Sequence, residues 1–271
     1  MRFNHIFKLT NENKTHREYK CNNVNINIDF ISDSALRVAV FNDNAKMLPT
    51  FTVNPNNNLS SFGRSRLSTD GFDCVAPVVE KFDNKEQFIL ACGVTVDLDL
   101  NNFILSYSKE SKFLFGDRPP LAYNFEGEFG NGSYHYITRE DDEHIFGLGD
   151  KSGPINKAGR VYRIETADSM GFDAEKTDPL YKHVPFYICE NSVGAYGIYY
   201  DTTDTSFVDL GREINNYYCH FKYFKTDDDC LVYYVFFGNK LSVLQQYACL
   251  CGKQAFPPKW SFDYCGSTMA Y

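Results

Sequence analysis

Apolar and polar residues alternate with a period of two along much of this chain. In "NVNINIDF" the apolar residues Val24, Ile26, Ile28 and Phe30 fall on one face, and residues 94–100, "VTVDLDL", repeat the pattern. Successive side chains of a strand point to opposite faces of a sheet, so this alternation predicts half-buried antiparallel strands. Further strands are predicted at residues 35–41, 86–92, 103–108, 134–138, 160–166, 184–190, 195–201, 217–224 and 230–237.

Turn-forming residues separate the predicted strands. They occur at residues 42–44, 54–58, 101–102 and 191–192, where Asn, Asp, Pro and Ser tolerate the backbone geometry of turns. The clearest hairpin is predicted at residues 186–200, where "ENSVG" joins two apolar strands. Many short strands with few helical windows predict a mainly β protein, a large antiparallel β-sandwich rather than a parallel α/β sheet.

One segment near the C-terminal end has helical periodicity instead. In residues 238–253, "GNKLSVLQQYACLCGK", Asn239 is a good N-cap residue and Gly252 a good C-terminal stop. The apolar residues that recur at three- and four-residue spacing are Leu241, Leu244, Ala248 and Cys251. We therefore expect one short helix, docked on the sandwich.

Composition narrows the possible partners. The 27 basic and 35 acidic side chains give a formal net charge of −8, which repels duplex nucleic acid, so no nucleic-acid partner is expected. The acidic runs at residues 139–144 and 225–230 lie between predicted strands, and we interpret both as solvated turns, with a cation site as the alternative. The 24 Phe and 19 Tyr suit strands, and we assign most of them to the core.

Targeting signals and cysteine usage favour a cytoplasmic protein. The N-terminal residues have no apolar stretch after the basic residue, and no segment reaches the ~20 apolar residues of a membrane span, so no membrane association is expected. The nine Cys are odd in number and lack a disulfide framework spacing. Buried reduced thiols in a reducing cytosol are the expectation.

Two loops depart from the alternating pattern and combine charge with glycine. Residues 146–163, "FGLGDKSGPINKAGRVYR", open with G-x-G, but no G-x-G-x-x-G and no amphipathic helix follow, so a nucleotide site is not expected. Residues 165–187, "ETADSMGFDAEKTDPLYKHVPFY", form a long polar connection with Asp168, Asp173, Asp178 and His183. This second loop is either a binding loop or an ordered surface loop whose acids cap turns.

Other chemistry finds little support in the sequence. The six His lack the i, i+4 spacing of a zinc site, and the Cys pair at residues 249 and 251 has no second ligand pair, so neither a metal nor another cofactor is expected. No G-x-S-x-G elbow of a serine hydrolase is present. Pairs of carboxylates are too common to indicate acid–base catalysis without geometry.

Two blocks of the chain resemble one enzyme family. Residues 146–188, "FGLGDKSGPINKAGRVYRIETADSMGFDAEKTDPLYKHVPFYI", resemble the characteristic N-terminal block of the family 31 glycoside hydrolases, the α-glucosidase family. Residues 256–271, "FPPKWSFDYCGSTMAY", resemble the beginning of that family's catalytic barrel. The blocks follow each other in the family's order and spacing, with the short helix between them, whereas residues 1–145 match only as a strand-rich region.

The resemblance implies a domain organisation. Residues 1–255 would form a galactose-mutarotase-like β-sandwich, and residues 256–271 would begin a (β/α)₈ barrel, truncated after its first strand. In this family the two catalytic Asp, the nucleophile and the acid/base of a retaining mechanism, lie on later barrel strands. The resemblance therefore implies no catalytic residue within these 271 residues.

The resemblance also implies two sugar-contacting residues. Asp168, in "ETADSMGFD", is similar to an Asp on the long sandwich loop of relatives that hydrogen-bonds sugar hydroxyls, although relatives often have Asn-Thr before the acid where this chain has Thr166-Ala167. Tyr271 resembles an aromatic residue at the end of the first barrel strand that can line the sugar pocket. We interpret Lys182 and His183 as structural residues that hold the loop against the sheet.

The hypothesis from the sequence is the N-terminal part of a retaining α-glycosidase, an α-glucosidase that removes terminal α-linked glucose from oligosaccharides or glucosides. Its partners would be that substrate and its own C-terminal catalytic barrel, and the 271-residue chain alone would be inactive. The alternative is a freestanding carbohydrate-binding or interaction module. A third function, aldose mutarotation, needs a His/Glu pair on a concave face, and the sequence singles out no such pair.

Overall fold

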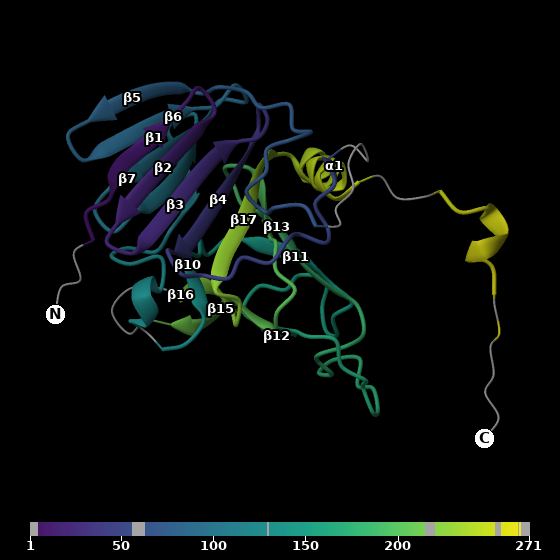
Figure 1. Cartoon of the computed structure of the whole chain (residues 1–271). Helices are drawn as coiled ribbons and strands as arrows, with labels where there is room; N and C mark the ends of the chain where they lie inside the picture. The colour runs from purple at the N-terminus through teal and green to yellow at the C-terminus, as the bar shows by residue number, and fades with distance from the viewer. Residues whose placement is uncertain are drawn as a thin grey trace.

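The computed structural model describes residues 5–55, 63–128, 130–214, 220–252, 256–264 and 266, and within these it is an antiparallel β-sandwich with one α-helix (Figure 1). The largest sheet has eight strands in the order β1 (Lys8–Glu12), β2 (His16–Cys21), β3 (Val24–Phe30), β4 (Ala35–Asn42), β17 (Cys230–Gly238), β14 (Ala195–Tyr200), β13 (His183–Glu190) and β11 (His144–Gly149). The predicted sandwich is thereby confirmed.

Two smaller sheets complete the β structure. The five-stranded sheet is a meander of β5 (Val78–Phe82), β6 (Lys85–Ile89), β7 (Val94–Asp99), β8 (Ile104–Lys109) and β9 (Lys112–Gly116). The four-stranded sheet has the order β10 (Ser133–Thr138), β16 (His220–Thr226), β15 (Ser206–Ile214) and β12 (Val161–Ile164). A short 3₁₀ helix, Phe125–Gly127, precedes β10.

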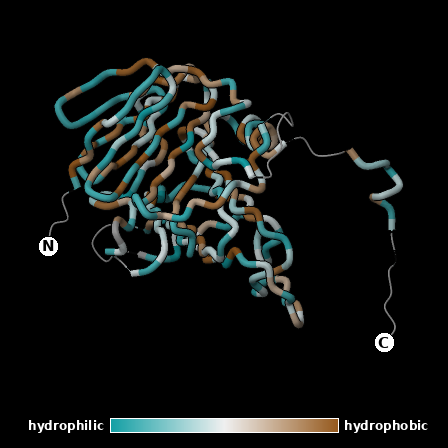
Figure 2. The backbone as a smooth tube through the Cα atoms, in the orientation of Figure 1, coloured by the Kyte–Doolittle hydropathy of each residue, from teal (hydrophilic) through white to brown (hydrophobic). Residues whose placement is uncertain are grey.

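One core fills the space between the sheets. Buried residues of the eight-stranded sheet, such as Ile28, Val38 and Val235, belong to the same cluster as Val96 of β7 and Leu210 of β15. The alternation of hydrophobic and polar residues that builds this core can be followed along the strands in Figure 2. Burial of this apolar surface is the main favourable term in folding.

The middle strands of the largest sheet are buried on both faces. Nearly every residue of β17, "CLVYYVFFG", is buried, and all six of β14 are. A second apolar cluster on the outer face, which includes Phe236 of β17 and Tyr199 of β14, lies beneath the α-helix. These two strands therefore read as continuous apolar runs, because water reaches neither face.

The predicted helix is confirmed as α1 (Lys240–Cys251), but the apolar residues that recur in its sequence are not the ones it buries. Asn239 and Ser242 form the reciprocal hydrogen bonds of a capping box at its start. Val243 and Leu250 are the buried residues, whereas Leu241 and Leu244 are 65% and 50% exposed. Gly197 of β14 lies under Val243, where a Cβ atom would come within 2.5 Å of that side chain. Two apolar stripes exist on this helix, and the sequence does not say which one meets the sheet.

The predicted first barrel strand stays a prediction, because the described part of the closing stretch shows no strand. Lys259–Phe262 is a 3₁₀ helix, and the segment extends away from the sandwich (Figure 1). Phe256, Trp260 and Tyr264 are 97%, 70% and 97% exposed. A barrel strand needs hydrogen-bonded neighbours, which these residues do not have among the described part of the chain.

The acidic runs contain more than solvated turns, which corrects the sequence interpretation. Glu143 is buried and its carboxylate lies 2.6 Å from the ammonium of Lys222, while Asp228 is buried 2.6 Å from a guanidinium nitrogen of Arg66. The runs do lie between strands as predicted. Each of them sends one acid into the interior, where a buried charge requires a partner of opposite sign.

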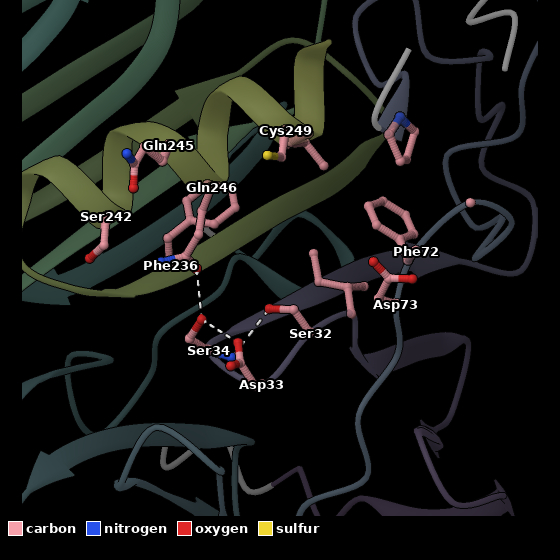
Figure 3. A pocket seen from close by; sticks show the side chains of 14 residues that line it. Ser32, Asp33, Ser34, Phe72, Asp73, Phe236, Ser242, Gln245, Gln246 and Cys249 are labelled. Carbon is pink, nitrogen blue, oxygen red and sulfur yellow. Dashed lines mark hydrogen bonds between the residues drawn. The ribbon is translucent and has the colours of Figure 1, made fainter. Parts of the chain in front are cut away.

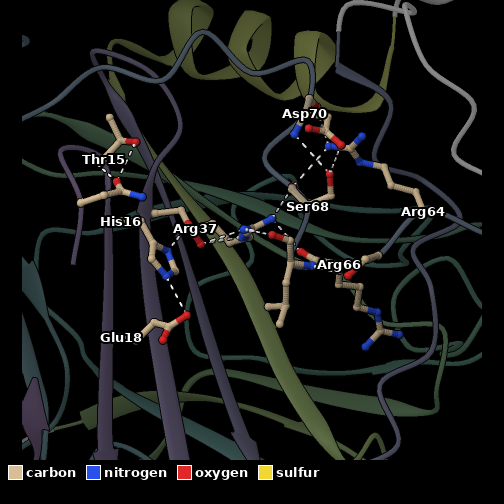
Figure 4. Close-up of polar contacts among 12 residues, drawn as sticks. Thr15, His16, Glu18, Arg37, Arg64, Arg66, Ser68 and Asp70 are labelled. Carbon is tan, nitrogen blue, oxygen red and sulfur yellow. Dashed lines mark hydrogen bonds and ion pairs between the residues drawn. The ribbon is translucent and has the colours of Figure 1, made fainter. Parts of the chain in front are cut away.

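Arg37 on β4 ties the long connection between β4 and β5 to the sheet (Figure 4). Its guanidinium donates to the backbone carbonyls of residues 66–68 and lies 2.7 Å from Asp29 Oδ2. Burial would raise the pKa of Asp29, but the hydrogen bond from His16 and the charge of Arg37 outweigh it and lower that pKa. A planar guanidinium with five donors suits this arrangement, because it can bond three carbonyls and a carboxylate together.

The described cysteines are all free thiols, but only some of them are buried as expected. Cys189 and Cys230 are buried, and burial raises the pKa of each thiol to about 12. Cys249, in contrast, is exposed on α1. Within the described ranges no helix has the length and apolar character to cross a membrane.

Candidate functional site

The two polar loops that the sequence singles out lie against each other. Residues 150–160 connect β11 to β12, and residues 165–182 connect β12 to β13 and project from the sandwich near β12 (Figure 1). The backbone N–H of Gly153 donates to Ala174 O at 2.7 Å, and Arg160 Nη1 donates to Glu175 O at 3.2 Å. The first loop therefore supports the second, and we name residues 165–182 the long loop.

A buried lysine fixes the base of the long loop. The ammonium of Lys151 donates to Arg163 O at 2.5 Å and to Asp178 Oδ1 at 2.8 Å, and its nitrogen lies 3.2 Å from His183 Nδ1. The Lys151 side chain has no exposed surface. Asp178 Oδ2 also accepts the backbone N–H of Arg163 at 2.6 Å. Lys151 thus joins the strand before the loop, the loop itself and the strand after it.

The electrostatics of this base favour a neutral His183. Burial and the nearby charge of Lys151 both lower the pKa of His183, and burial also lowers the pKa of Lys151 against the hydrogen bond to Asp178. His183 Nε2 lies 2.6 Å from Leu180 O, so this nitrogen donates and Nδ1 is left to accept from Lys151. The backbone carbonyl of Lys182 accepts from the N–H of Asp150. These contacts agree with the structural roles expected for Lys182 and His183.

Asp168 is an exposed residue of the long loop. Its Oδ1 accepts a hydrogen bond from the Tyr181 hydroxyl at 2.8 Å, and this bond raises the pKa of Tyr181. Nearby Met170 and Phe172 are 94% and 68% exposed. A carboxylate oriented in this way can accept hydrogen bonds from hydroxyl groups, and exposed apolar side chains can contact the carbon-bound hydrogens of a sugar.

The remaining acids of the long loop are structural. Asp173 Oδ1 accepts the backbone N–H of Glu175 at 2.8 Å, and Asp173 O accepts that of Thr177 at 3.0 Å. Asp173 therefore caps a turn, and Asp178 belongs to the buried base. Asp168 and Asp173 are the exposed residues among the four candidates, and of these two Asp168 is the one whose carboxylate bonds a side-chain hydroxyl and caps no turn.

The glycines of "FGLG" serve the sheet and support no nucleotide site. Gly147 and Gly149 have φ angles of 126° and 79°, and β11 shifts register against β13 between them. A Cβ atom would lie 2.5 Å from Phe186 O at the first position and 2.6 Å from Lys182 O at the second. The G-x-G spacing thus marks a bulge where two backbones approach closely.

A His–acid pair does occur in the sandwich, and sequence reasoning missed it. His135 Nε2 lies 2.9 Å from Asp117 Oδ1, and both residues are buried. The imidazole stacks on the rings of Tyr233 and Tyr123, with centroids 4.5 and 5.1 Å away. This pair is enclosed by aromatic core residues, which leaves no room for a sugar. No local sequence signal identifies it, because the two residues come from different strand regions.

Two further sequence predictions concern Tyr271 and a metal site. Tyr271, the second predicted sugar contact, lies outside the described residues. Among the residues that are described, no group of three or more His, Cys, Asp or Glu side chains is placed to hold a metal ion.

The fold and the long loop lie within a region that matches a known family. Residues 25–209, more than half of the chain, match the model of the glycosyl hydrolase 31 N-terminal galactose mutarotase-like domain. The chain belongs to this family. The three sheets are thus the galactose-mutarotase-like sandwich of a family 31 N-terminal domain, as the resemblance implied.

Relatives of this family 31 domain are several times longer. Alpha-glucosidase 2 of Bacillus thermoamyloliquefaciens is 27% identical over 219 residues, which cover 78% of this chain and 26% of the relative. Alpha-xylosidase of Saccharolobus solfataricus is 25% identical over 256 residues, 92% of this chain and 31% of the relative. A family 31 dextranase of Flavobacterium johnsoniae, solved with isomaltotriose, has a TM-score of 0.77 at 23% identity and is matched over 96% of this chain and 30% of its own. The chain therefore spans less than a third of these relatives.

Proposed function

We propose that this chain is the part of a retaining α-glycosidase that contributes the long loop to the substrate pocket, and that the enzyme is an α-glucosidase acting on terminal α-linked glucose. The family match over residues 25–209 carries this proposal, because it includes the whole long loop. Among the relatives is an α-glucosidase, while the α-xylosidase shows that the preferred sugar varies between similar chains.

In this proposal Asp168 positions the sugar and takes no part in bond breaking. Its carboxylate accepts hydrogen bonds from two sugar hydroxyls, which fixes the orientation of the ring. Tyr181 holds one carboxylate oxygen at 2.8 Å in the free protein, so the group is oriented before the substrate arrives. The nucleophile and the acid/base of the retaining mechanism lie on a catalytic barrel outside these 271 residues, to which the segment after α1 leads.

The test is a substitution of Asp168 in the enzyme that includes the barrel. We expect Asp168→Ala to lower kcat/KM for an α-glucoside. The decrease should correspond to about 1–3 kcal/mol of lost transition-state stabilisation, the cost of a lost charged hydrogen bond. Tyr181→Phe is the matched variant, since it removes only the hydroxyl that orients Asp168, and a smaller decrease is expected. Steady-state kinetics measure both, with circular dichroism as the check on folding. Unaltered kinetics of a folded Asp168→Ala enzyme would remove Asp168 from the site.

A further inference from the structure

A concave site lies beside α1 and is not lined by the exposed Leu241 and Leu244. A cavity of about 370 Å³ is enclosed by three segments: one side of α1, the turn between β3 and β4, and residues 71–73 (Figure 3). Its volume falls in the range of small-molecule pockets, about 300–1,000 Å³. No part of the long loop lines it.

The floor of this α1 pocket is apolar and its rim is polar. Ile31, Phe236 and Leu250 form the floor and are all buried. At the rim, the exposed residues Asp33 and Asp73 stand on the two segments opposite α1, as Figure 3 shows. A ligand that fits must therefore combine an apolar body with a polar group that faces the rim.

The pocket is held in shape by hydrogen bonds among its own walls. Ser34 Oγ lies 2.7 Å from Asp33 Oδ1 and 3.2 Å from Gln246 Oε1, which links the turn to the helix. Gln246 Nε2 donates to Phe237 O at 2.9 Å, so the amide of Gln246 is used on both sides. The capping box fixes the first turn of α1 in the same place. Such a site loses little conformational freedom when it binds a ligand.

The rim carries negative charge that the described residues do not neutralise. Neither Asp33 nor Asp73 forms an ion pair with any part of the chain that the structure describes, and no Lys or Arg lines the pocket. Arg64 lies over the ring of Phe72, 5.8 Å from its centroid, and donates to the backbone carbonyls of Ser68 and Asp70. The charged groups that line the pocket are thus both carboxylates.

We propose that the α1 pocket binds a small organic ammonium ion. The ammonium lies at the rim, where the carboxylates of Asp33 and Asp73 attract it, while the hydrocarbon part lies on the floor of Ile31, Phe236 and Leu250. A cation suits the rim better than a neutral polyol does. The lining has two carboxylates and no basic residue, so its charge favours a cation, whereas the donors open to a polyol are neutral groups such as the amide of Gln245.

The probe is benzylammonium, compared with benzyl alcohol, which has nearly the same shape and no charge. In calorimetric titration of the 271-residue chain we expect benzylammonium to bind about tenfold more tightly than benzyl alcohol, and added salt to weaken only the cation. The double variant Asp33→Asn/Asp73→Asn should lose about tenfold in affinity for benzylammonium. Asp83→Asn, which neutralises an exposed acid in the turn between β5 and β6, is the control and should bind as the parent does.

A second variant tests the same charge argument in the opposite direction. Gln245 is an exposed pocket residue on α1, so Gln245→Glu adds a carboxylate at the rim without disturbing the core and should tighten benzylammonium binding. The proposal is overturned if the two probes bind equally, or if the folded Asn variant binds benzylammonium as the parent does. It is also overturned if glucose or isomaltose binds this pocket and benzylammonium does not, which would make it a polyol site.

Discussion

Lys151 is the residue on which the geometry of the long loop depends. Its ammonium meets a strand carbonyl, a loop carboxylate and an imidazole, and its side chain is completely enclosed. Asp178 and His183 stand out in the sequence because they lie in an unusual loop. Lys151 does not, since it lies on a different loop and its partners come from 12 to 32 positions further along the chain. A sequence pattern shows only which residues are close along the chain. The contacts of Lys151 join residues that come together only when the chain folds.

We expect Lys151→Met to lower the free energy of unfolding by about 1–3 kcal/mol, because the buried side of Asp178 and the carbonyl of Arg163 lose their donor. Methionine keeps most of the length of the side chain and removes the ammonium with its donors. Lys182→Met is the matched control, since the Lys182 side chain is exposed and only its carbonyl is used, so its stability should remain within about 0.5 kcal/mol of the parent. Urea denaturation measures both, and equal midpoints would contradict the role of Lys151.

The pKa values of His183 and His16 should shift in opposite directions from the ordinary value of 6.5. Burial lowers the pKa of His183, whereas the hydrogen bond to Asp29 raises that of His16. Between its folded and unfolded pKa values, His183 binds more protons in the unfolded chain, so its contribution to stability decreases as the pH falls below 6.5. His16 contributes most below that value and loses its contribution as the pH rises through its folded pKa. Imidazole NMR titration measures both, and a His183 pKa at or above 6.5 is the contrary result.

At the scale of elements, alternation predicts β3 and β7, and a continuous apolar run predicts β17. Strands with mostly exposed side chains are missed. β1 and β5 are edge strands with mostly exposed side chains, so nothing in their sequence alternates. Edge strands with charged residues are common because charge prevents pairing with other chains. β15 is interrupted at Gly211, whose φ of 98° disturbs the regular strand.

α1 shows the limit of periodicity in a different way. Its start and end follow from Asn239 and Gly252, and the capping residues behave as expected. Its orientation is decided by the surface beneath it: Gly197 leaves space for Val243, and the ring of Phe186 stacks on that of Tyr247 at 4.0 Å. A helical stripe in the sequence therefore predicts a helix more securely than it predicts which side faces the core.

A pair of alanine variants separates the two stripes of α1. Val243→Ala should lower the free energy of unfolding by about 1–3 kcal/mol, because a fully buried side chain leaves a cavity over β14. Leu244→Ala, at the next position along the helix, removes a half-exposed side chain and should change it by less than about 1 kcal/mol. Thermal or urea unfolding gives both values. A larger loss for Leu244→Ala would mean that the helix packs through its other face.

For the whole molecule, the long alternation of the sequence predicts an antiparallel sandwich, and the resemblance predicts its family. Neither reveals the strand order, because β4 pairs with β17 and β11 with β13 across long stretches of chain. The charge networks are equally hidden: Glu143 and Asp228 lie in acidic runs that look solvated, yet each meets a buried cation contributed by a distant strand or loop.

If the catalytic carboxylates lie on a barrel beyond these residues, the 271-residue chain alone should not hydrolyse an α-glucoside, because transfer of the glycosyl group requires that pair. The measurement is release of p-nitrophenol from p-nitrophenyl α-glucoside by the purified chain, with the barrel-containing enzyme as the positive control. Turnover by the chain alone, retained through a second purification, would overturn this part of the proposal. Titration with isomaltotriose on the same sample reports whether the long loop binds sugar by itself, as the freestanding-module alternative requires.

β17 lies in the middle of the eight-stranded sheet, with β4 on one side and β14 on the other. Because Cys230 pairs with Phe41, the two halves of the sheet can join only after β17, which ends at Gly238, has left the ribosome. Closing so long a segment costs chain entropy before any contact compensates for it, so this step should be slow compared with the formation of the local hairpins. During synthesis the first four strands wait with the edge of β4 unpaired, and this interval is when the nascent protein is most exposed to wrong pairing with other chains.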